Sequence, residues 1–432
     1  MCGNIAQYWL KGYWAGELVS VALVKALPLL PIMTSKERII LILLAALNFT
    51  HILDFMIMMP LGSYLMPYFN ISGQKFSVIV AAYSVSACVA SLVASFFVDG
   101  FDRKKVLLFG YIGFLVGTIL CGFAPSANLL LAARIVAGLF GGLIGAQVMS
   151  IVADTFPYER RGQAMGYLMT AFSLASVIGV PMGLVLANEI SWHAPFLLVG
   201  ILGILVVPLL VRYIPSMTKH LHTAAAGEKV SRIENFLSIF RNNKQVLALT
   251  LAGSLMLGHF LIIPFINPFM EFNVGFSKGQ TKFIYMVGGV VTLISAPLAG
   301  KLADKVGKLK LYVWAAILSL PPIFLITNMP IIPFYYVLIV TGFWFMVANA
   351  RGVTASAMVS GVVAPEHRGS FMSINSAIQQ MCTGIAALIA GFIVVTDKTT
   401  QKISHYPWVG YLSLAVILIC IFLGKRLGEQ KQ

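Results

Sequence analysis

Charged residues are scarce in this chain. Of its 432 residues only 10% are Asp, Glu, Lys or Arg, while 59% are apolar, and the mean hydropathy is +0.89. A soluble globular domain carries roughly 25% charged residues. Even a large soluble domain buries only about 75% of the surface of its unfolded chain, so much of this apolar surface would stay in water. The composition therefore excludes a water-soluble enzyme and indicates a protein whose solvent is mostly lipid.

Paired cysteines and catalytic motifs are missing as well. The five cysteines are scattered, odd in number and without a CxxC spacing: Cys2, Cys88, Cys121, Cys382 and Cys420. Neither a disulfide framework nor a metal site is therefore indicated. The chain also lacks a Walker A sequence, a His/Cys cluster with metal-ligand spacing and a recognisable nucleophile–base motif. We expect no enzyme activity, no cofactor, no metal and no direct use of ATP.

Acidic residues are half as numerous as basic ones. Fifteen Asp and Glu stand against thirty Lys and Arg, which gives a formal net charge of +15. The basic residues lie in short clusters between apolar runs, as the positive-inside rule requires of cytoplasmic loops. Charge placed for topology needs no polyanionic partner, so we expect no binding of nucleic acid.

What the sequence does contain is a series of long apolar runs. A helix needs about 20 residues to cross the hydrocarbon core of a bilayer. Twelve runs of suitable length are separated by polar or Pro/Gly-containing segments: residues 39–60, 76–98, 106–124, 129–153, 163–188, 192–214, 245–270, 281–303, 310–328, 332–361, 371–395 and 406–424. Since backbone groups in lipid must be satisfied within the segment, each run is predicted to be a helix. The predicted fold class is an all-α integral membrane protein with twelve transmembrane helices.

Lys and Arg divide unequally between the two sets of alternating loops. One set, which starts before the first helix, contains Lys36, Arg38, Arg103, Lys104, Lys105, Arg160, Arg161, the basic residues from Arg212 to Lys244, Lys301, Lys305, Lys308, Lys310, Arg368, Lys425, Arg426 and Lys431. The other set contains Lys75, Lys278, Lys282, Lys398 and Lys402. The predicted location is the bacterial inner membrane, with both termini in the cytoplasm.

Two loop sequences occur twice in the chain. Residues 99–104 (DGFDRK) are matched by residues 304–309 (DKVGKL), and residues 157–162 (PYERRG) by residues 365–369 (PEHRG). The two pairs have nearly the same offset, and a long polar stretch, residues 215–244, lies between their members. The sequence therefore predicts two six-helix bundles related by a parallel repeat, residues 34–214 and 245–432, joined by a basic cytoplasmic linker at 215–244.

Residues 1–33 do not fit this pattern. Their apolar stretch is interrupted by Lys25 and by prolines, and the sequence from Met33 resembles a natural bacterial start. We interpret residues 1–33 as an N-terminal extension that is unstructured or arises from a misassigned start codon. An interfacial amphipathic segment or the apolar region of a signal peptide is the alternative.

The repeated loops resemble those of the major facilitator superfamily, and the resemblance extends from Met33 to the end of the chain. Residues 95–105 are similar to the family's signature between helices 2 and 3, although Ser95 and Asp102 stand where the signature has glycines, and residues 300–308 are the closer copy. Arg134 with Gly138 resembles the R-x-x-x-G motif of helix 4. The resemblance implies two helical bundles that alternate access to a central site.

A second motif narrows the resemblance. Gly179, Pro181 and Gly183 resemble the antiporter motif of helix 5 in its G-V-P-x-G form, and Trp192 follows that helix. This form is typical of the twelve-helix proton-coupled exporters of drugs, sugars and nucleosides. The glycines and the proline also permit close helix approach and a kink.

Ionisable residues inside a membrane helix are costly and call for a partner or a function. Among the acids, Asp54 alone lies well inside a predicted span, and Asn48 and His51 precede it at spacings of three, so the three share one helix face. Helices 1 and 4 are neighbours in the superfamily, so Asp54 is expected to pair with Arg134. We predict that Asp54, His51 and Arg134 couple transport to protons; a static ion pair is the alternative.

Arg351 is the second cation inside a predicted span, and no buried acid of its own half is available to it. It must use carbonyls, amides, water or an anionic substrate, or be satisfied by Asn and Gln side chains alone.

Pro264 and Pro268 predict that helix 7 is broken and lines the central site. The candidate substrate-binding residues are Asn48, His259, Asn267, Asn349, Arg351, Asn375 and Gln379.

Charged residues at the helix ends are candidates for a gate. The resemblance assigns Asp99 and Arg103 to a charge latch at the cytoplasmic gate, with Asp154 as the candidate partner of Arg103. Asp304 is the counterpart of Asp99 in the second half. A role in topology alone is the alternative for these charges.

The sequence thus predicts a secondary active transporter that exports a small organic compound in exchange for protons by alternating access. An importer or facilitator of a sugar or organic anion is the alternative. The expected partners are a small-molecule substrate, protons and membrane lipid, and the protein is expected to act as a monomer.

Overall fold

A computed structural model of the chain describes residues 33–429, apart from 95–97, 157–163, 165–166, 169, 219–238, 364–367 and 398. The predictions for residues 1–32, for most of the linker and for the repeated loop sequences at 157–162 and 365–367 lie outside the described residues.

The described part of the chain is almost entirely helical. The first half contains α3 (Ser35–Ile57), α4 (Gly62–Phe69), α5 (Gly73–Ala94), the 3-10 helix η2 (Val98–Gly100), α6 (Arg103–Gly122), α7 (Ala127–Thr155), the π-helix η3 (Ala175–Gly179), α9 (Val180–Glu189) and α10 (Ala194–Tyr213). The second half contains α13 (Asn243–Phe260), α14 (Ile263–Phe272), α15 (Lys278–Val306), α16 (Lys308–Leu318), α17 (Leu320–Thr327), α18 (Phe334–Ser360), α19 (Arg368–Ile393), β1 (Val395–Thr396), β2 (Ile403–Ser404) and α20 (Tyr406–Glu429). Within these residues twelve helical segments are long and apolar enough to cross a membrane, which confirms the predicted number of spans and the fold class.

The first span begins four residues earlier than its apolar run. Thr34 caps α3: its hydroxyl accepts the Glu37 N–H at 3.3 Å, and the Glu37 carboxylate accepts the Thr34 N–H at 2.8 Å. This reciprocal capping satisfies two backbone donors that no helical carbonyl can reach. The predicted start at residue 39 was therefore late, because a polar capping turn carries no apolar signal.

Three spans are interrupted where prolines remove backbone donors. The seventh span breaks between α13 and α14, just before Pro264, as predicted. The ninth span breaks at Ser319, before two consecutive prolines, which the sequence analysis did not foresee. In the fifth span the turn before Pro181 widens into the π-helix η3. A proline lacks the N–H of the helical ladder and clashes with the preceding turn, so each helix adjusts at that point.

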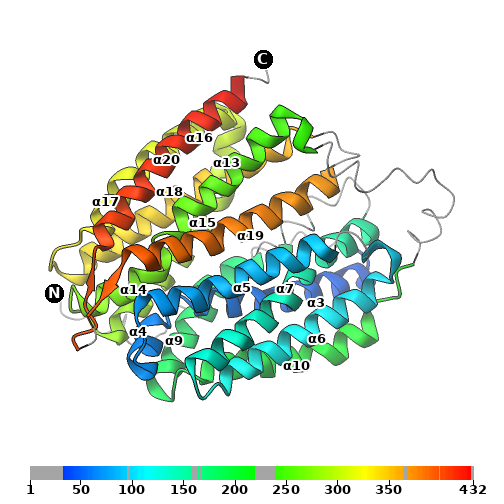
Figure 1. Ribbon diagram of the computed structural model, residues 1–432. Coiled ribbons are helices and arrows are strands. Elements are labelled where there is room, and N and C mark those ends of the chain that lie inside the picture. The colour runs from blue at the N-terminus through cyan, green and yellow to red at the C-terminus, as the bar shows by residue number, and fades with distance from the viewer. Residues whose placement is uncertain are drawn as a thin grey trace, which may run out of the picture.

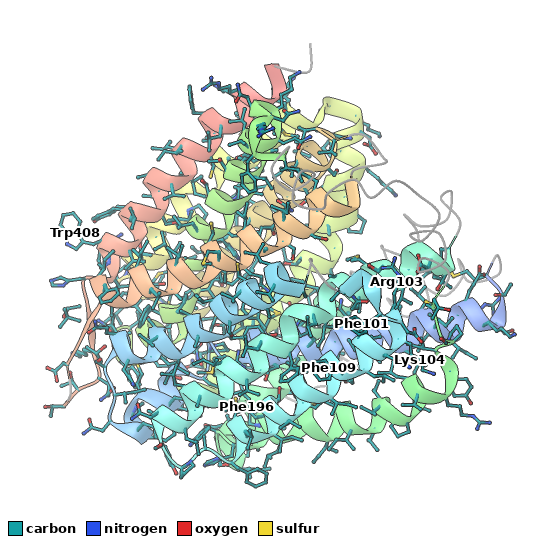
Figure 2. All side chains as sticks on the ribbon, turned by 45° about the vertical axis from the view of Figure 1, so that its right-hand side comes forward. Phe101, Arg103, Lys104, Phe109, Phe196 and Trp408 are labelled. Carbon is teal, nitrogen blue, oxygen red and sulfur yellow. The ribbon has the colours of Figure 1, made fainter. Side chains whose placement is uncertain are left out.

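The two halves lie side by side and diverge toward one end of the molecule (Figure 1). We call the end where α10 finishes and α13 begins the linker end, and the end that carries β1 and β2 the hairpin end. Arg103 and Lys104 lie at the linker end, whereas Trp408 lies at the opposite end (Figure 2). The helices run from one of these ends to the other.

Three apolar clusters show how the halves are joined. One cluster contains buried side chains of both halves, from Leu53 on α3 to Ile417 on α20. A second contains only residues of the first half, between Met33 and Ile214, and a third contains only residues of the second half, between Ile239 and Leu427. We call these the shared core and the two private cores. Apolar burial therefore joins the halves toward the hairpin end, while each half keeps its own core toward the linker end.

Close backbone contacts between the halves also lie toward the hairpin end. A Cβ on Gly289 of α15 would lie 2.8 Å from the Ser176 carbonyl carbon, and one on Gly391 of α19 would overlap the Ser77 side chain of α5. Glycine permits this approach because it has no side chain. Between α19 and α20, β1 and β2 pair antiparallel, and the Thr396 hydroxyl accepts the Gly73 N–H from the other half at 3.1 Å. The hairpin end is therefore closed in this structure.

Candidate functional site

The centre of the candidate site is an ion pair between α3 and α7. Arg134 Nη1 donates to Asp54 Oδ2 at 2.7 Å, and the two side chains are 1% and 0% exposed. Among the residues that the structure describes, Asp54 Oδ1 and Arg134 Nε are buried and make no hydrogen bond. The structure thus brings together the two ionisable residues that the sequence places inside spans of the first half, with part of their bonding capacity unused.

Tyr83 of α5 completes this cluster. The Arg134 guanidinium lies over the Tyr83 ring, with Cζ 4.4 Å from the ring centroid, and a hydrogen bond of 2.7 Å joins the Tyr83 hydroxyl to His51 Nε2. Attraction between a cation and the ring face stabilises the guanidinium on the side away from the carboxylate. Four residues on three helices, His51, Asp54, Tyr83 and Arg134, therefore form one connected polar group.

Glycines of α7 let α5 come close enough to build the cluster. A Cβ on Gly138 would overlap the Tyr83 backbone, and one on Gly141 would lie 2.5 Å from the Tyr83 hydroxyl. Both glycines are on the same helix as Arg134. Packing thus explains why the motif has glycine at position 138: the absence of a side chain lets Tyr83 of α5 come close to Arg134 of α7.

The sequence analysis did not identify Tyr83, because an aromatic residue in an apolar helix is usually core or interface. The sequence marks this position only through the serines that follow it. With Ser84 and Ser86, Tyr83 makes one turn in the middle of α5 more polar than its neighbours. The position of the ring over Arg134 depends on tertiary packing, which one sequence does not reveal.

Replacing Tyr83 with phenylalanine tests the polar contact separately from the ring. Tyr83→Phe keeps the ring over Arg134 but removes the bond to His51, so unfolding should become easier by about 0.5–1.5 kcal/mol. The pH profile of transport should also move, because His51 loses its partner beside Asp54. Tyr111→Phe is the matched control, since the Tyr111 hydroxyl bonds Thr50 at 2.9 Å and does not touch the ion pair. Tyr111→Phe should lose a similar amount of stability and keep the pH profile of the wild type. The same pH profile in both variants would show that the bond between Tyr83 and His51 does not affect the pH dependence of transport.

The residues of the predicted antiporter motif face α3 next to Asp54. A Cβ on Gly179 would lie 2.8 Å from Leu53 Cδ1, and one on Gly183 would lie 2.6 Å from Ile57 Cδ1. Pro181 stands in the first turn of α9, directly after the π-helix. These residues therefore set how closely the fifth span packs on the turn of α3 that carries Asp54.

Arg351 of α18 is 3% exposed and turns toward the ninth span, where its Nη1 donates to Ser319 Oγ at 2.9 Å. The Asn349 side chain instead donates to the Thr292 carbonyl and to Ser295 Oγ of α15, at 3.3 and 3.2 Å. The hydroxyl at the break of the ninth span, and not an Asn or Gln side chain, is thus the hydrogen-bond partner of Arg351.

The other predicted substrate-binding residues lie on several helices. His259 of α13 stacks on Trp344 of α18, with ring centroids 4.9 Å apart, and its Nδ1 has no partner. Asn375 of α19 is buried with Oδ1 unpartnered, whereas Asn48 and Gln379 are half-buried. Unpartnered polar atoms on facing elements are what a polar ligand needs, so these positions remain candidates.

Asn267 is placed differently from the other candidates. It is fully buried at the hairpin end, where its Nδ2 donates to the Pro60 carbonyl at 3.1 Å and to Glu271 Oε1 at 3.0 Å. Pro60 belongs to the first half and Asn267 to the second. The contact therefore joins the halves rather than lining the Asp54 region.

Two of the predicted gate residues meet at the linker end. Arg103 Nε lies 2.7 Å from Asp154 Oδ2, and the two side chains are 16% and 35% exposed. Asp304 is exposed, and the side chain of Asp99 lies outside the described residues. The Arg103–Asp154 pair links the first turn of α6 to the last turn of α7, so both partners belong to the first half.

Asp102, which departs from the family signature, organises the start of α6. Its carboxylate accepts the Lys104 N–H at 3.0 Å, the Met217 N–H at 2.9 Å and the Ser216 hydroxyl at 2.6 Å. Burial opposes ionisation here, but these hydrogen bonds outweigh it and hold the pKa of Asp102 below its ordinary value. The aspartate thus caps α6 and fixes the chain that leaves α10.

Comparison with known proteins decides the family. The family model of the Major Facilitator Superfamily matches residues 44–266 and residues 248–430. The chain belongs to this superfamily. It is therefore a multi-pass membrane transporter of small molecules and not an enzyme, as the sequence predicted.

Relatives of this superfamily transporter include exporters. A probable sugar efflux transporter of Mannheimia succiniciproducens is 24% identical over 75% of this chain and 78% of its own. Multidrug resistance protein 2 of Bacillus subtilis is 22% identical over 87% of this chain and 92% of its own. Among solved structures, a bacterial homologue of the lysosomal transporter Spinster, in an inward-facing and unoccupied conformation, has a TM-score of 0.70 at 13% identity and covers 92% of this chain and 98% of its own. The structural likeness supports the fold.

Proposed function

We propose that this transporter exports a small organic compound in exchange for protons by alternating access. The observation that carries the proposal is the fully buried Asp54–Arg134 pair. A buried ion pair is stable only while both partners are charged and matched. A proton on Asp54 removes one charge and leaves Arg134 without its partner, so protonation changes which packing of the helices is preferred.

A change at Asp54 can affect the rest of the molecule through the packing of α3. Leu53 and Ile57, on either side of Asp54 in this helix, belong to the shared core, whereas Leu44 and Leu47 belong to a private core. Leu53 and Ile57 also contact the glycines of the fifth span. A shift of α3 when Asp54 is protonated would therefore act on the packing that closes the hairpin end.

Orientation follows from the distribution of charge. The linker end carries Lys36, Arg38, Arg103, Lys104 and many other basic residues, which by the positive-inside rule assigns it to the cytoplasm. On this assignment the structure is the inward-facing state, with the hairpin end closed toward the outside. The names of the efflux relatives support export as the direction.

Proton release measures the coupling directly. Purified protein in weakly buffered detergent is mixed with a panel of cationic dyes, sugars, nucleosides and organic acids, and the pH of the solution is recorded. A transported compound should release protons from the wild type. Asp54→Asn, which keeps the shape of the side chain but binds no proton, should bind the compound without release, and its uphill export from proteoliposomes should fall to background.

Glu189→Gln is the matched control, because Glu189 is exposed at the end of α9, where its Oε1 accepts the Asn188 side-chain amide at 2.8 Å. This variant should behave like the wild type. Proton-driven export by Asp54→Asn would remove Asp54 from the coupling role. Binding without proton release by the wild type would favour a facilitator and leave the ion pair a structural role.

A further inference from the structure

Another buried carboxyl group lies in the second half, near the hairpin end. Glu271, near the end of α14, is 9% exposed. Its Oε1 accepts the Thr281 hydroxyl at 2.7 Å and Asn267 Nδ2 at 3.0 Å, while Oε2 is buried and makes no hydrogen bond. The carboxyl group is therefore only half satisfied.

No cation within salt-bridge distance neutralises Glu271 in the part of the chain that the structure describes. Lys278 is in the same region, but its Nζ lies 4.1 Å from the centroid of the Tyr64 ring. Two phenols, Tyr64 of α4 and Tyr285 of α15, also face the carboxyl group, and both hydroxyls lack a partner. The Glu189 carboxylate is also close enough to Tyr64 to influence its hydroxyl electrostatically.

Of these groups Glu271 is the buried carboxyl group. Burial raises the pKa of Tyr64 above its ordinary value, so this phenol stays neutral. Glu189 is exposed and hydrated. A pH response of this region therefore depends on the Glu271 carboxyl group.

The surroundings of Glu271 include residues of both halves. Asn267 and Thr281, which hold the carboxyl group, belong to the second half, and Asn267 also donates to the Pro60 carbonyl of the first half. Ser63 of α4, which follows Pro60 in the chain, lies close to the Glu271 carboxyl group. Separating the halves at this end would expose Glu271 to water and break the Asn267–Pro60 bond.

We propose that Glu271 is a second proton-binding site, and that proton uptake from the hairpin-end side accompanies closure of that end. Closure moves an unpaired carboxylate out of water, which costs free energy unless it takes up a proton. Opening returns it to water and releases the proton. The Ser63 hydroxyl is near enough to accept a hydrogen bond from the acid.

The sign of the pH dependence follows from linkage. The closed hairpin end binds the proton on Glu271 more tightly than the open end, so acid pH favours the closed state and a rise in pH favours the open state. The proposal rests on alternating access as proposed above, but it does not require that Asp54 carry the coupled proton.

A distance between two spin labels at the hairpin end measures the opening. Phe123, after α6, and Ile331, before α18, are 67% and 84% exposed and belong to different halves. Both are replaced with cysteine and labelled in a variant without the native cysteines, which is then reconstituted in lipid nanodiscs. The fraction of long distances should rise as the pH is raised from 5 to 8.5.

Four variants decide between the outcomes. Glu271→Gln, which mimics the protonated acid, should shift toward the closed state and lose the part of the pH dependence that Glu271 supplies, whereas the control Glu189→Gln should keep the whole of it. Thr281→Val removes a donor to the charged carboxylate and should move the midpoint to higher pH. Asp54→Asn should keep the part of the pH response that Glu271 supplies, which separates this proposal from the coupling assigned to Asp54.

A pH response in Glu271→Gln equal to that of the wild type would overturn the proposal, as would an opening that grows toward acid pH. If Glu271→Gln does not fold, a midpoint in Thr281→Val equal to that of the wild type would overturn it by itself.

Discussion

Arg134→Ala should lower the free energy of unfolding by about 3–5 kcal/mol, because it leaves the Asp54 carboxylate buried without a partner. The variant also loses the cation that lies over the Tyr83 ring. Unfolding by heat or by denaturing detergent, followed through helical circular dichroism, measures the loss. Transport should disappear with it, since the charge that responds to a proton on Asp54 is gone.

The second ion pair of the first half provides a matched control. Arg103→Ala breaks the partly exposed pair with Asp154, and such pairs are worth less than about 1 kcal/mol. A double variant, Asp54→Asn with Arg134→Gln, should recover part of the stability lost in Arg134→Ala because no charge stays unpaired. A loss in Arg134→Ala no larger than that in Arg103→Ala would mean that water reaches the pair.

Gly391→Leu should shift the transporter away from the state with a closed hairpin end. Its side chain would occupy the space of Ser77 on α5, and overpacking of this kind costs about 1–3 kcal/mol or more. At the upper value the ratio of closed to open molecules falls about 100-fold. Spin labels at positions 123 and 331 should then report long distances at every pH, and transport should be strongly reduced.

Gly145→Leu is the control for added volume in a helix, since nothing lies within 4 Å of a Cβ at this position. It should keep the wild-type distances. Unchanged distances in Gly391→Leu would show that α5 and α19 can separate at this contact without opening the hairpin end.

The sequence could predict the spans, the repeat and the Asp54–Arg134 pair. The spans follow from the cost of polar groups in lipid, the repeat from the recurring loop sequences, and the pair from the cost of an unpaired charge together with the resemblance that makes helices 1 and 4 neighbours. An acid and an arginine at similar depth in neighbouring spans have few alternatives to pairing. The break of the seventh span was predictable for a similar reason, since proline removes a backbone donor.

Other features depend on contacts between segments that one sequence does not bring together. Tyr83 and Ser319 are ordinary residues of apolar helices until packing places them against Arg134 and Arg351. Glu271 directly follows a predicted span, and its burial results from the meeting of the two halves, which one sequence does not reveal. The β1–β2 hairpin is too short to give a periodic signal.

The division of the apolar interior into one shared and two private cores has a consequence for natural variation in this protein. A substitution in a private core, at Leu107 or Leu249 for example, acts on a half that keeps its packing whichever way the molecule faces. Such a substitution destabilises both conformations equally, so their ratio stays the same. It changes the amount of protein that folds. With alternating access as proposed, a substitution in the shared core, at Phe265 for example, acts on a surface that is assembled and taken apart in every turnover. Substitutions in the private cores therefore alter the amount of folded protein, whereas substitutions in the shared core alter the rate of transport.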